Sequence, residues 1–379
     1  MAGQRKLRMG MVGGGPGAFI GPVHRIAAEL DGKIELVAGA FSQSAERSRG
    51  AGEMYKIDPA RAYPDYKAMI EAEKKREDAI DFVAIVTPNH LHKPVAVAAL
   101  EVGFPVMSDK PATATYAEAV ELEKAVAKSG LPYGLTHTYA GYSMVREMRQ
   151  ICASGELGKI RKIAVEYLQG WLSNPIETSG QKQASWRSDP AQSGAGGCIG
   201  DIGTHAFHLS EYVTGLKVVA VNASLLSVVP GRKLDDDCTA LLRMDNGAQN
   251  VLMTSQIAAG ERNDMRLRVY GEKGSIEWHQ EDPNRLSVKW LDAPEEIRHA
   301  SGGYLSEDAR AVTRLPGGHP EGYLEAFAVL YREFADTLIG WKQKSVLSPT
   351  LPGIEAGVRG MRFIDRAVES SKKQSWVEF

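Results

Sequence analysis

Three side chains have types and a spacing that could carry chemistry. Lys110 supplies an ammonium group in Asp109-Lys110-Pro111, whereas Asp201 and His205 supply a carboxylate and an imidazole in a later, glycine-rich segment. If that segment is helical, the spacing of Asp201 and His205 puts both side chains on one face. Together the three groups could remove the proton of a hydroxyl and stabilise the charge that develops on its oxygen. The pattern therefore predicts alcohol oxidation, provided that a hydride acceptor binds nearby.

The amino-terminal segment has the pattern of a site for such an acceptor. An apolar strand over 7–12 runs into a glycine-rich turn, and a helical pattern follows over 23–30. Gly13 permits the tight turn, Gly15 lets the backbone approach a pyrophosphate, and the next helix presents free N–H groups to it. The third small residue of the motif is either Ala18 or, if the loop is longer, Gly21. The predicted dinucleotide contacts of this turn are Gly13, Gly15, Gly17, Ala18, Phe19 and Ile20.

Composition argues against several other classes of protein. The length of 379 residues predicts two or three domains. A net charge of −2 gives no electrostatic footprint for nucleic acid or an anionic membrane. No apolar run approaches the ~20 residues of a membrane span, and the run after the basic amino terminus is too short for a signal peptide. Cys152, Cys198 and Cys238 lack zinc spacing and indicate a reduced, cytoplasmic protein.

Strands alternate with helices over residues 1–137. The expected strands are 7–12, 35–41, 80–86, 106–107 and 132–135, and the expected helices are 23–30, 45–56, 66–75, 94–101 and 116–128. This alternation predicts an α/β Rossmann domain with a doubly wound parallel sheet. Ligands of such sheets bind at the carboxyl ends of the strands. Gly13, Ser42, Thr87 and Asp109 would all lie at that edge.

The remaining residues, 138–379, have the pattern of an α+β domain. Helices are expected over 142–153, 321–339 and 353–371, and strands over 160–168, 217–228, 238–244, 249–257, 265–270, 275–279 and 285–290. Hairpin signals at 245–247 and 271–274 predict a large, mainly antiparallel open sheet with helices on one face. The carboxyl-terminal helices could pack back on the first domain. Apolar residues on the other sheet face predict a homo-oligomer, either a dimer or a tetramer.

With these motifs in place, the chain resembles the Gfo/Idh/MocA oxidoreductases, the glucose-fructose oxidoreductase and inositol dehydrogenase family, over nearly its whole length. The resemblance rests on the glycine turn, on Thr87-Pro88-Asn89-His90-Leu91-His92, on Asp109-Lys110-Pro111 in place of the commoner Glu-Lys-Pro, and on the segment 197–205. The longer glycine loop and the segments 184–187 and 319–323 are most similar to the branch with levoglucosan dehydrogenase and glucoside 3-dehydrogenases.

The resemblance implies roles for individual residues. Lys110 corresponds to the family's catalytic lysine, and Asp201 and His205 to its acid/base pair, with Asp201 orienting the neutral imidazole. Contacts on the nicotinamide side are implied for Thr87, Pro88, Asn89, His92, Asp109 and Lys110. His92 could instead simply begin the following helix. The family works without a metal, so His208 beside this pair is not expected to bind one.

The choice between NAD and NADP depends on the end of the second strand. An NAD-specific turn normally has an acidic residue there to hold the ribose hydroxyls, but this chain has Ser42 and Gln43, with Arg47 nearby. Arg47 would tolerate a 2′-phosphate, whereas Ser42 can bond a ribose hydroxyl. Because the branch that the chain resembles is associated with NAD, we expect NAD and leave NADP open, with Ser42, Gln43 and Arg47 as cofactor contacts.

The expected substrate is a sugar or a cyclitol. Tryptophan faces suit the apolar face of a sugar ring, and the long loop 169–197 carries two of them, although both could be core or interface residues. The substrate candidates are Tyr139, Trp171, Trp186, Arg187, Asp201, His205 and His319. The predicted reaction is NAD(P)-dependent oxidation of a secondary ring hydroxyl of a sugar, anhydrosugar, glycoside or cyclitol. The alternatives are glycoside cleavage by transient oxidation, and a non-catalytic sugar sensor.

Overall fold

The residues that the structure describes form two compact units. The computed structural model describes residues 5–187, 189–343 and 350–379. The first unit combines Met1–His137 with Phe327–Val358, and the second combines Thr138–Ala326 with Arg359–Phe379. The chain therefore leaves the first unit after His137 and returns to it at Phe327.

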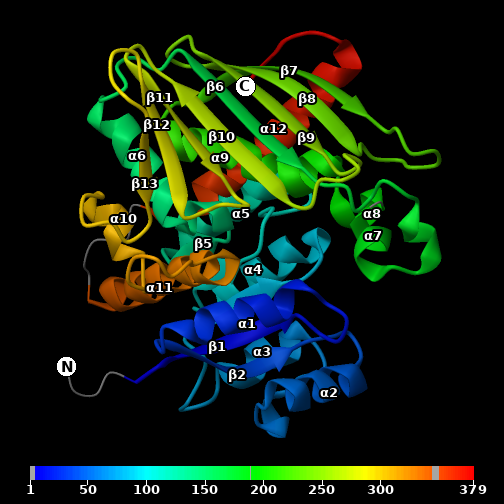
Figure 1. Ribbon diagram of the computed structural model, residues 1–379. Coiled ribbons are helices and arrows are strands. Elements are labelled where there is room, and N and C mark those ends of the chain that lie inside the picture. Colours follow the sequence, from blue (N-terminus) through cyan, green and yellow to red (C-terminus); the bar gives the residue numbers. More distant parts are fainter. Residues whose placement is uncertain (1–4, 188, 344–349) are drawn as a thin grey trace. The chain divides into compact units, whose positions relative to one another are not determined.

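The sheet of the first unit is parallel, which confirms the predicted doubly wound fold. Its strands are β1 (Leu7–Gly13), β2 (Ile34–Ala40), β3 (Phe82–Val86), β4 (Val106–Ser108) and β5 (Tyr133–Leu135). They lie in the order β2-β1-β3-β4-β5, and β1 and β2 are labelled side by side in Figure 1. Because β1 pairs with both β2 and β3, the strand order reverses beside β1, and ligands of such sheets bind outside the carboxyl ends at this point.

Helices α1 (Ile20–Leu30), α2 (Ala45–Tyr55), α3 (Tyr66–Glu73), α4 (His92–Glu101) and α5 (Tyr116–Ser129) connect these strands. Local sequence sets several of their ends. The Ser44 side chain accepts from Arg47 N at the start of α2, and Thr115 and Glu118 form a capping box on α5. Gly130 then ends α5 in a left-handed conformation with φ of 65°.

Part of helix α11 (Tyr323–Lys342) completes the core of the first unit. The ring of Phe334 meets Phe82 of β3 edge-on at 5.2 Å, and both side chains are fully buried. Further along the chain, Leu135 N donates to Pro352 O at 2.8 Å. The cofactor-type sheet therefore depends on residues far from it in sequence.

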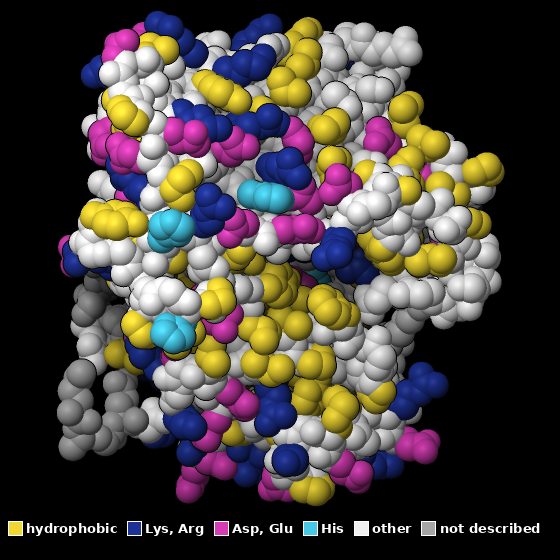
Figure 2. All heavy atoms as spheres, viewed as in Figure 1, with side chains coloured by type: hydrophobic (Ala, Val, Ile, Leu, Met, Phe, Trp, Pro, Cys, Tyr) yellow, Lys and Arg dark blue, Asp and Glu magenta, His cyan; other side chains and the backbone are white. Residues whose placement is uncertain are grey.

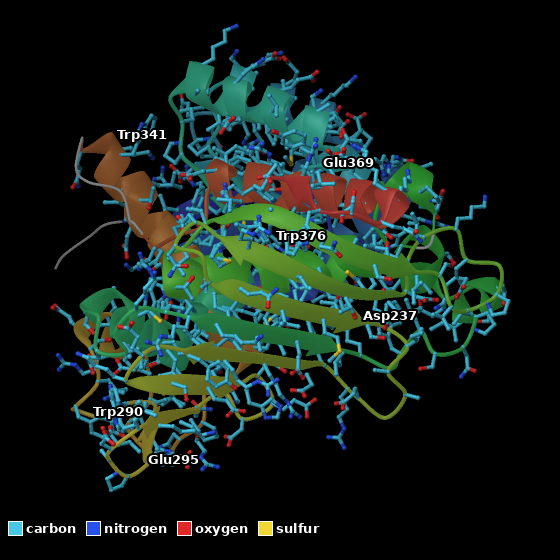
Figure 3. All side chains as sticks on the ribbon, turned by 90° about the horizontal axis from the view of Figure 1, so that it is seen from above. Asp237, Trp290, Glu295, Trp341, Glu369 and Trp376 are labelled. Atoms are coloured by element: carbon cyan, nitrogen blue, oxygen red, sulfur yellow. The ribbon has the colours of Figure 1, made fainter. Side chains whose placement is uncertain are left out.

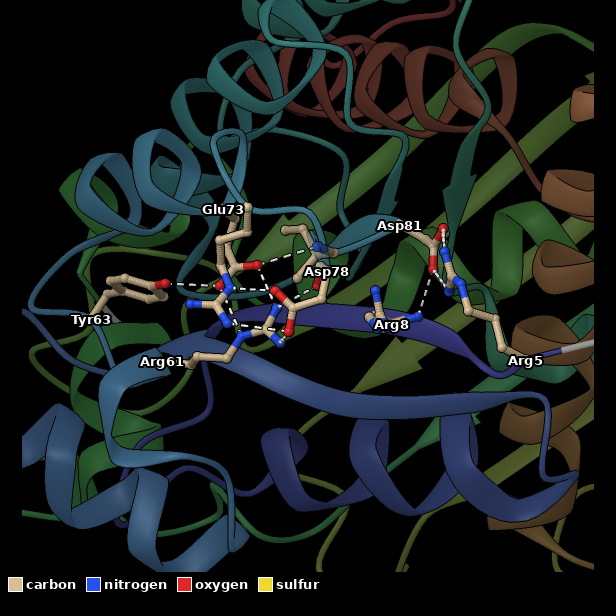
Figure 4. A network of polar contacts seen from close by, with 9 residues as sticks. Arg5, Arg8, Arg61, Tyr63, Glu73, Asp78 and Asp81 are labelled. Atoms are coloured by element: carbon tan, nitrogen blue, oxygen red, sulfur yellow. Dashed lines mark hydrogen bonds and ion pairs between the residues drawn. The ribbon is translucent and has the colours of Figure 1, made fainter.

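Arg61 and Glu73 form a buried ion pair near β2 in the first unit (Figure 4). Glu73 is inaccessible to solvent and accepts from Arg61 Nε at 3.0 Å, from Tyr63 Oη at 2.8 Å and from Ile80 N at 3.2 Å. Ser48 Oγ joins this side to the end of β2, because it accepts from Phe41 N and donates to Tyr63 O. The network therefore holds Tyr63 and α3 against the end of β2.

A second cluster in Figure 4 gives a stability prediction for Asp81. Its carboxylate accepts from Arg5 at 2.6 Å, from Arg8 N at 2.8 Å and from Lys342 Nζ at 2.9 Å. Burial alone would raise the pKa of Asp81, but these donors lower it to about 2. A carboxyl with a lowered pKa stabilises the fold above its unfolded pKa, and this contribution is lost as the pH falls through its folded pKa.

We therefore expect Asp81→Asn to lower the free energy of unfolding by about 1–2 kcal/mol at pH 7, since Arg5 and Lys342 are half exposed and screened. Below about pH 2, the folded pKa of Asp81, the variant and the wild type should converge. Urea unfolding at several pH values measures this difference. Glu71→Gln, which alters an exposed pair with Lys75, is the control. A difference that does not change with pH would contradict the assignment.

The sheet of the second unit is large and mainly antiparallel, as predicted. It has the order β13-β12-β11-β10-β6-β9-β8-β7-β14. Its strands are β6 (Lys162–Leu168), β7 (Val218–Leu226), β8 (Asp237–Met244), β9 (Gln249–Ser255), β10 (Asp264–Tyr270), β11 (Gly274–His279), β12 (Arg285–Trp290), β13 (Glu296–His299) and β14 (Val377–Glu378). The pair β6 and β9 is parallel, because these strands are brought together by long connections rather than by one hairpin. The short strands β13 and β14 are additions to the predicted set.

Helices cover one face of this sheet (Figures 1 and 3). They are α6 (Ser143–Ser154), α9 (Thr204–Thr214) and α12 (Ile354–Lys373), and the short α10 (Glu307–Ala311) packs on α6. Phe207 of α9 stacks on Phe363 of α12 with ring centroids 4.6 Å apart. Figure 2 shows charged side chains gathered on the other face. There, side chains of opposite charge pair across strands, as in Arg268–Glu166 and Lys289–Glu277.

In the described part of the chain, none of the helices combines the length and the apolar character that crossing a bilayer requires.

Candidate active site

The glycine turn after β1 has no room for side chains at two of its positions. Gly13 has φ of +93°, and a Cβ placed on it would lie 2.5 Å from Val86 O. A Cβ on Gly15 would clash with Phe41 O at the end of β2. The turn can therefore lie close to the ends of β2 and β3 only as glycine. Gly17, with φ of +78°, and Ala18, which donates to Gly15 O, continue the turn.

The structure distinguishes the two candidates for the third small residue. Helix α1 begins at Ile20, and a Cβ on Gly21 would clash with the Gly14 backbone. Gly21 therefore permits the close helix-to-turn packing that the third position of the motif requires, and the loop is the longer variant. Phe19, the residue before α1, is exposed and makes no side-chain cap, so among the described residues the first-turn N–H groups of α1 have no such acceptor. Those groups suit an anion.

Ser42, Gln43 and Arg47 lie directly after β2 and in the first turn of α2, at the carboxyl edge of the sheet. Ser42 Oγ accepts from Ser44 N at 3.3 Å, which forms a small turn. Phe41 packs on Tyr55, whose hydroxyl donates to Gly14 O at 2.6 Å. The end of β2 is thus tied to the glycine turn by α2.

The segment after β3 is fastened by His92. Thr87 and Pro88 follow the strand, and Asn89 begins a short 3₁₀ turn, η2 (Asn89–Leu91), before α4. His92 is buried, and its Nδ1 lies 2.6 Å from Pro111 O while its Nε2 lies 2.8 Å from Thr87 O. Burial lowers the pKa of His92. His92 thus connects the turn after β3 to the segment that carries Lys110, which is a bracing contact within the unit.

Asp109 and Lys110 lie directly after β4. Asp109 Oδ1 accepts from Lys110 N and from Thr136 Oγ1, both at 2.8 Å. Burial alone would raise the pKa of Asp109, but contact with His24 and the nearby charge of Lys110 hold it well below the usual range. An ionised carboxylate therefore fixes the backbone at Lys110.

Asp201 lies in a π-helical segment, η5 (Ile199–Gly203), that leads directly into α9, where His205 is the second residue. The sequence predicts a helix here but not the wider register. Thr204 Oγ1 donates to Gly200 O at 3.1 Å, while Thr204 N donates to Ile199 O, so the side chain replaces the usual backbone bond. Single π-turns inside helices are frequent at functional sites. Asp201 and His205 belong to the second unit, and Lys110 belongs to the first.

Two side chains from outside this helix, Arg187 and Gln256, donate hydrogen bonds to the Asp201 carboxylate. Arg187 Nε lies 3.0 Å and Gln256 Nε2 lies 2.9 Å from the same oxygen, Oδ2. Arg187 also stacks over Trp186, with its guanidinium carbon 4.3 Å from the ring centroid. The structure therefore brings three predicted residues together.

Tyr139 lies against His205, with ring centroids 5.0 Å apart and the rings almost perpendicular. Its hydroxyl is 2.5 Å from Tyr167 Oη, and Tyr167 in turn donates to Asn263 Oδ1 at 2.8 Å. Because Tyr167 uses its proton for Asn263, Tyr139 donates to Tyr167. Burial raises the pKa of both tyrosines, so both hydroxyls keep their protons. The chain of hydrogen bonds fixes the ring that borders His205.

The remaining substrate candidates, Trp171 and His319, belong to the second unit. Trp171 is half-buried and donates to Gln169 Oε1 at 2.9 Å. His319 is exposed, and its Nδ1 lies 3.2 Å from Pro316 O. The predicted loop 169–197 contains short helices, η4 (Ile176–Ser179), α7 (Lys182–Arg187) and α8 (Pro190–Ser193), and Trp186 and Arg187 end α7.

Asp235 is a residue of this region that the sequence did not indicate. Its two carboxylate oxygens accept from Gly197 N and Ile199 N, each at 2.7 Å, at the start of the segment with Asp201. Burial raises the pKa of Asp235 to about 6. Gln256 and Asn263 were also missed. All three act through contacts with residues distant in sequence, so no local motif could have indicated them. In the described residues, no group of His, Cys, Asp and Glu side chains is placed to hold a metal ion.

Both units match descriptions of one family. Residues 7–137 match "Oxidoreductase family, NAD-binding Rossmann fold", and residues 145–277 match "GFO/IDH/MocA C-terminal domain". The chain is 35% identical to the uncharacterized oxidoreductase YfiI of Bacillus subtilis over 99% of this chain and 97% of the relative. The chain therefore belongs to the Gfo/Idh/MocA oxidoreductases, and its first unit carries an NAD-binding Rossmann fold.

The names of two further relatives include a ring polyol. A crystal structure of an inositol dehydrogenase homologue from Azotobacter vinelandii, complexed with NAD+, has a TM-score of 0.96 and 35% identity, covering 99% of this chain and 98% of that chain. A second structure of that homologue contains NADH and myo-inositol. Levoglucosan dehydrogenase of Pseudarthrobacter phenanthrenivorans is 25% identical over 99% of this chain and 97% of its own length. The chain is thus an oxidoreductase of a family of sugar and cyclitol dehydrogenases.

Proposed function

We propose that the protein oxidises a secondary ring hydroxyl of a sugar, anhydrosugar, glycoside or cyclitol to a ketone, with NAD as the cofactor. The observation that carries the proposal is that one chain combines three features. They are a glycine turn without room for side chains, a lysine whose backbone Asp109 fixes, and Asp201 and His205, which contact Arg187 and Tyr139. Two relatives, an inositol 2-dehydrogenase and a levoglucosan dehydrogenase, act on ring polyols.

The residues of the first unit fit NAD. The turn from Gly13 to Ile20 and the uncapped start of α1 would hold the pyrophosphate, and Ser42, Gln43 and Arg47 would lie beside the adenosine ribose. Thr87, Pro88, Asn89 and Asp109 would border the nicotinamide, with His92 bracing them. When bound, NAD accepts a hydride from the carbinol carbon.

The side chains then handle the proton. In the proposed reaction, neutral His205 accepts the hydroxyl proton, and Asp201 holds the positive charge of the imidazolium that forms. Lys110 donates a hydrogen bond to the oxygen as it becomes a carbonyl. The residues proposed to contact the substrate are Trp171, Trp186, Arg187, Tyr139 and His319. Tyr139 would do so through the part of its ring that lies next to His205.

The test is a panel of ring polyols assayed for NADH and NADPH formation. It should include myo-inositol, scyllo-inositol, levoglucosan, glucose and simple glucosides, each with NAD and with NADP. We expect NADH to accumulate with at least one cyclitol or sugar, and NAD to be preferred. Release of aglycone from a glycoside without net NADH would instead indicate cleavage by transient oxidation. Binding of a sugar without either reaction would indicate a sensor.

We also propose that the protein is a cytoplasmic homo-oligomer. Its three cysteines are free thiols in the structure, which suits a reducing compartment. On the outer sheet face, β6, β8 and β9 place half-buried apolar side chains next to one another, including Ala164, Leu241, Val251 and Met253. A patch of this kind suits a contact with a second copy.

A further inference from the structure

A buried array of side chains lies behind Lys110 within the first unit. His24 of α1 and Tyr331 of α11 are both inaccessible to solvent. His24 Nδ1 lies 2.6 Å from Tyr331 Oη, and its Nε2 lies 3.9 Å from Asp109 Oδ2. The array therefore connects two helices to the residue directly before Lys110.

The direction of the hydrogen bonds follows from the groups present. Burial raises the pKa of Tyr331 well above its usual value, so its hydroxyl keeps the proton. Among the described residues, His24 is the hydrogen-bond partner of that hydroxyl, so the hydroxyl donates to Nδ1. The neutral ring then carries its proton on Nε2, which faces Asp109. The opposite tautomer would aim a lone pair at a carboxylate and leave the tyrosine proton without an acceptor.

The Asp109 carboxylate is held on both of its oxygens. Oδ1 accepts from Lys110 N and Thr136 Oγ1, and Oδ2 faces the Nε2–H of His24. At 3.9 Å this last contact is longer than a hydrogen bond, and it acts by the attraction between the N–H dipole and the charge. Rotation of the carboxylate would release the Lys110 backbone.

We propose that His24 and Tyr331 are positioning residues for Lys110, which act by holding the Asp109 carboxylate ionised and in one orientation. The inference rests on the proposed catalytic role of Lys110. Tyr331 sets the tautomer of His24, His24 orients Asp109, and Asp109 fixes the backbone from which the lysine side chain extends. A competing explanation is that His24 only fills the core, since its ring packs edge-on against Phe327 at 4.7 Å.

Tyr331→Phe separates the two explanations because it keeps the ring and removes only the hydroxyl. We expect kcat to fall about 10-fold, because a displaced catalytic group costs one to two orders of magnitude, while KM and NADH affinity stay within about twofold. Tyr63→Phe is the matched control, since it removes the hydroxyl of a partly buried tyrosine of the same unit, which donates to Glu73, and it should leave kcat unchanged. Equal kcat in Tyr331→Phe and wild type, with both folded, would overturn the inference.

A double-mutant cycle tests whether His24 acts through Asp109. We expect His24→Gln to lower kcat about 10-fold in the wild type but by less than about twofold in Asp109→Asn, since the group through which it acts is already altered. Additive losses would overturn the inference. In His24→Gln, the acid limb of kcat should also move to higher pH, because burial raises the pKa of Asp109 once the contact with His24 is lost.

Two further results separate this inference from the proposed function. Nitrogen NMR of labelled histidine, assigned by comparison with His24→Gln, should show His24 protonated on Nε2 in the wild type and a changed tautomer in Tyr331→Phe. Protonation on Nδ1 in the wild type would overturn the array. Unchanged turnover in Lys110→Ala would overturn the proposed function and this inference with it. A loss in Lys110→Ala without a loss in Tyr331→Phe would overturn this inference alone.

Discussion

Lys110→Ala and His205→Ala are each expected to lose at least ~100-fold in turnover while still binding NAD(H), since a positioned acid or base typically contributes roughly 10²–10⁴-fold. His205 is 8% exposed and borders Tyr139, and its replacement would remove the proposed proton acceptor. Lys110 keeps its backbone contacts with Asp109 in the variant. Initial rates with the best substrate of the panel, together with NADH binding by fluorescence, measure the effect.

Matched surface variants control for a general loss of activity. Lys93→Ala removes a lysine of α4 that pairs with Glu121, and His299→Ala removes an exposed histidine of β13. Both should retain full turnover. The assignment fails for whichever of Lys110 and His205 can be replaced with near-normal kcat. Loss of NADH binding in the same variant would indicate a structural role instead.

Gly15→Val is expected to abolish NAD(H) binding. A side chain on Gly15 clashes with Phe41 O at the end of β2, so the turn must move away from the strand ends, and with it the N–H groups that would hold a pyrophosphate. Calorimetric titration with NADH should show at least a ~100-fold weaker affinity, since several hydrogen bonds to a charged group are lost together.

Gly50→Val is the matched control for this variant. Gly50 lies in α2, and a Cβ there would meet open space. Because valine has a higher helix propensity than glycine, the substitution should not destabilise this helix. The control should bind NADH as the wild type does. An unchanged affinity in Gly15→Val, with the melting temperature preserved, would show that the turn does not hold the cofactor.

Local patterns were enough to predict the sheets and the edge that carries the first part of the site. The alternation of strands and helices placed Gly13, Ser42, Thr87 and Asp109 at strand ends, where the structure has them. Hairpin signals predicted most of the second sheet. The parallel pairing of β6 with β9 was not predictable in this way, because it depends on connections of many residues rather than on a turn.

The finer structure of the site depends on contacts between distant residues. Sequence reasoning linked Asp201 only to His205, whereas the structure adds Gln256 and Arg187 as donors to its carboxylate. The π-helical register at Asp201 is accompanied by a bond from Thr204 Oγ1 to Gly200 O, and spacing alone reveals neither. His24 and Tyr331 are 307 positions apart, so nothing local to either residue indicates their hydrogen bond.

The return of the chain to its first unit has a consequence for synthesis on the ribosome. Phe334 and Tyr331 fill the interior behind β3 and α1, yet they are translated only after all of Thr138–Ala326. The hydrophobic core of the amino-terminal unit therefore stays incomplete while the intervening polypeptide is synthesised. A fragment that stops at His137 would expose the surfaces that these aromatic rings cover, and it would lack the partner of His24.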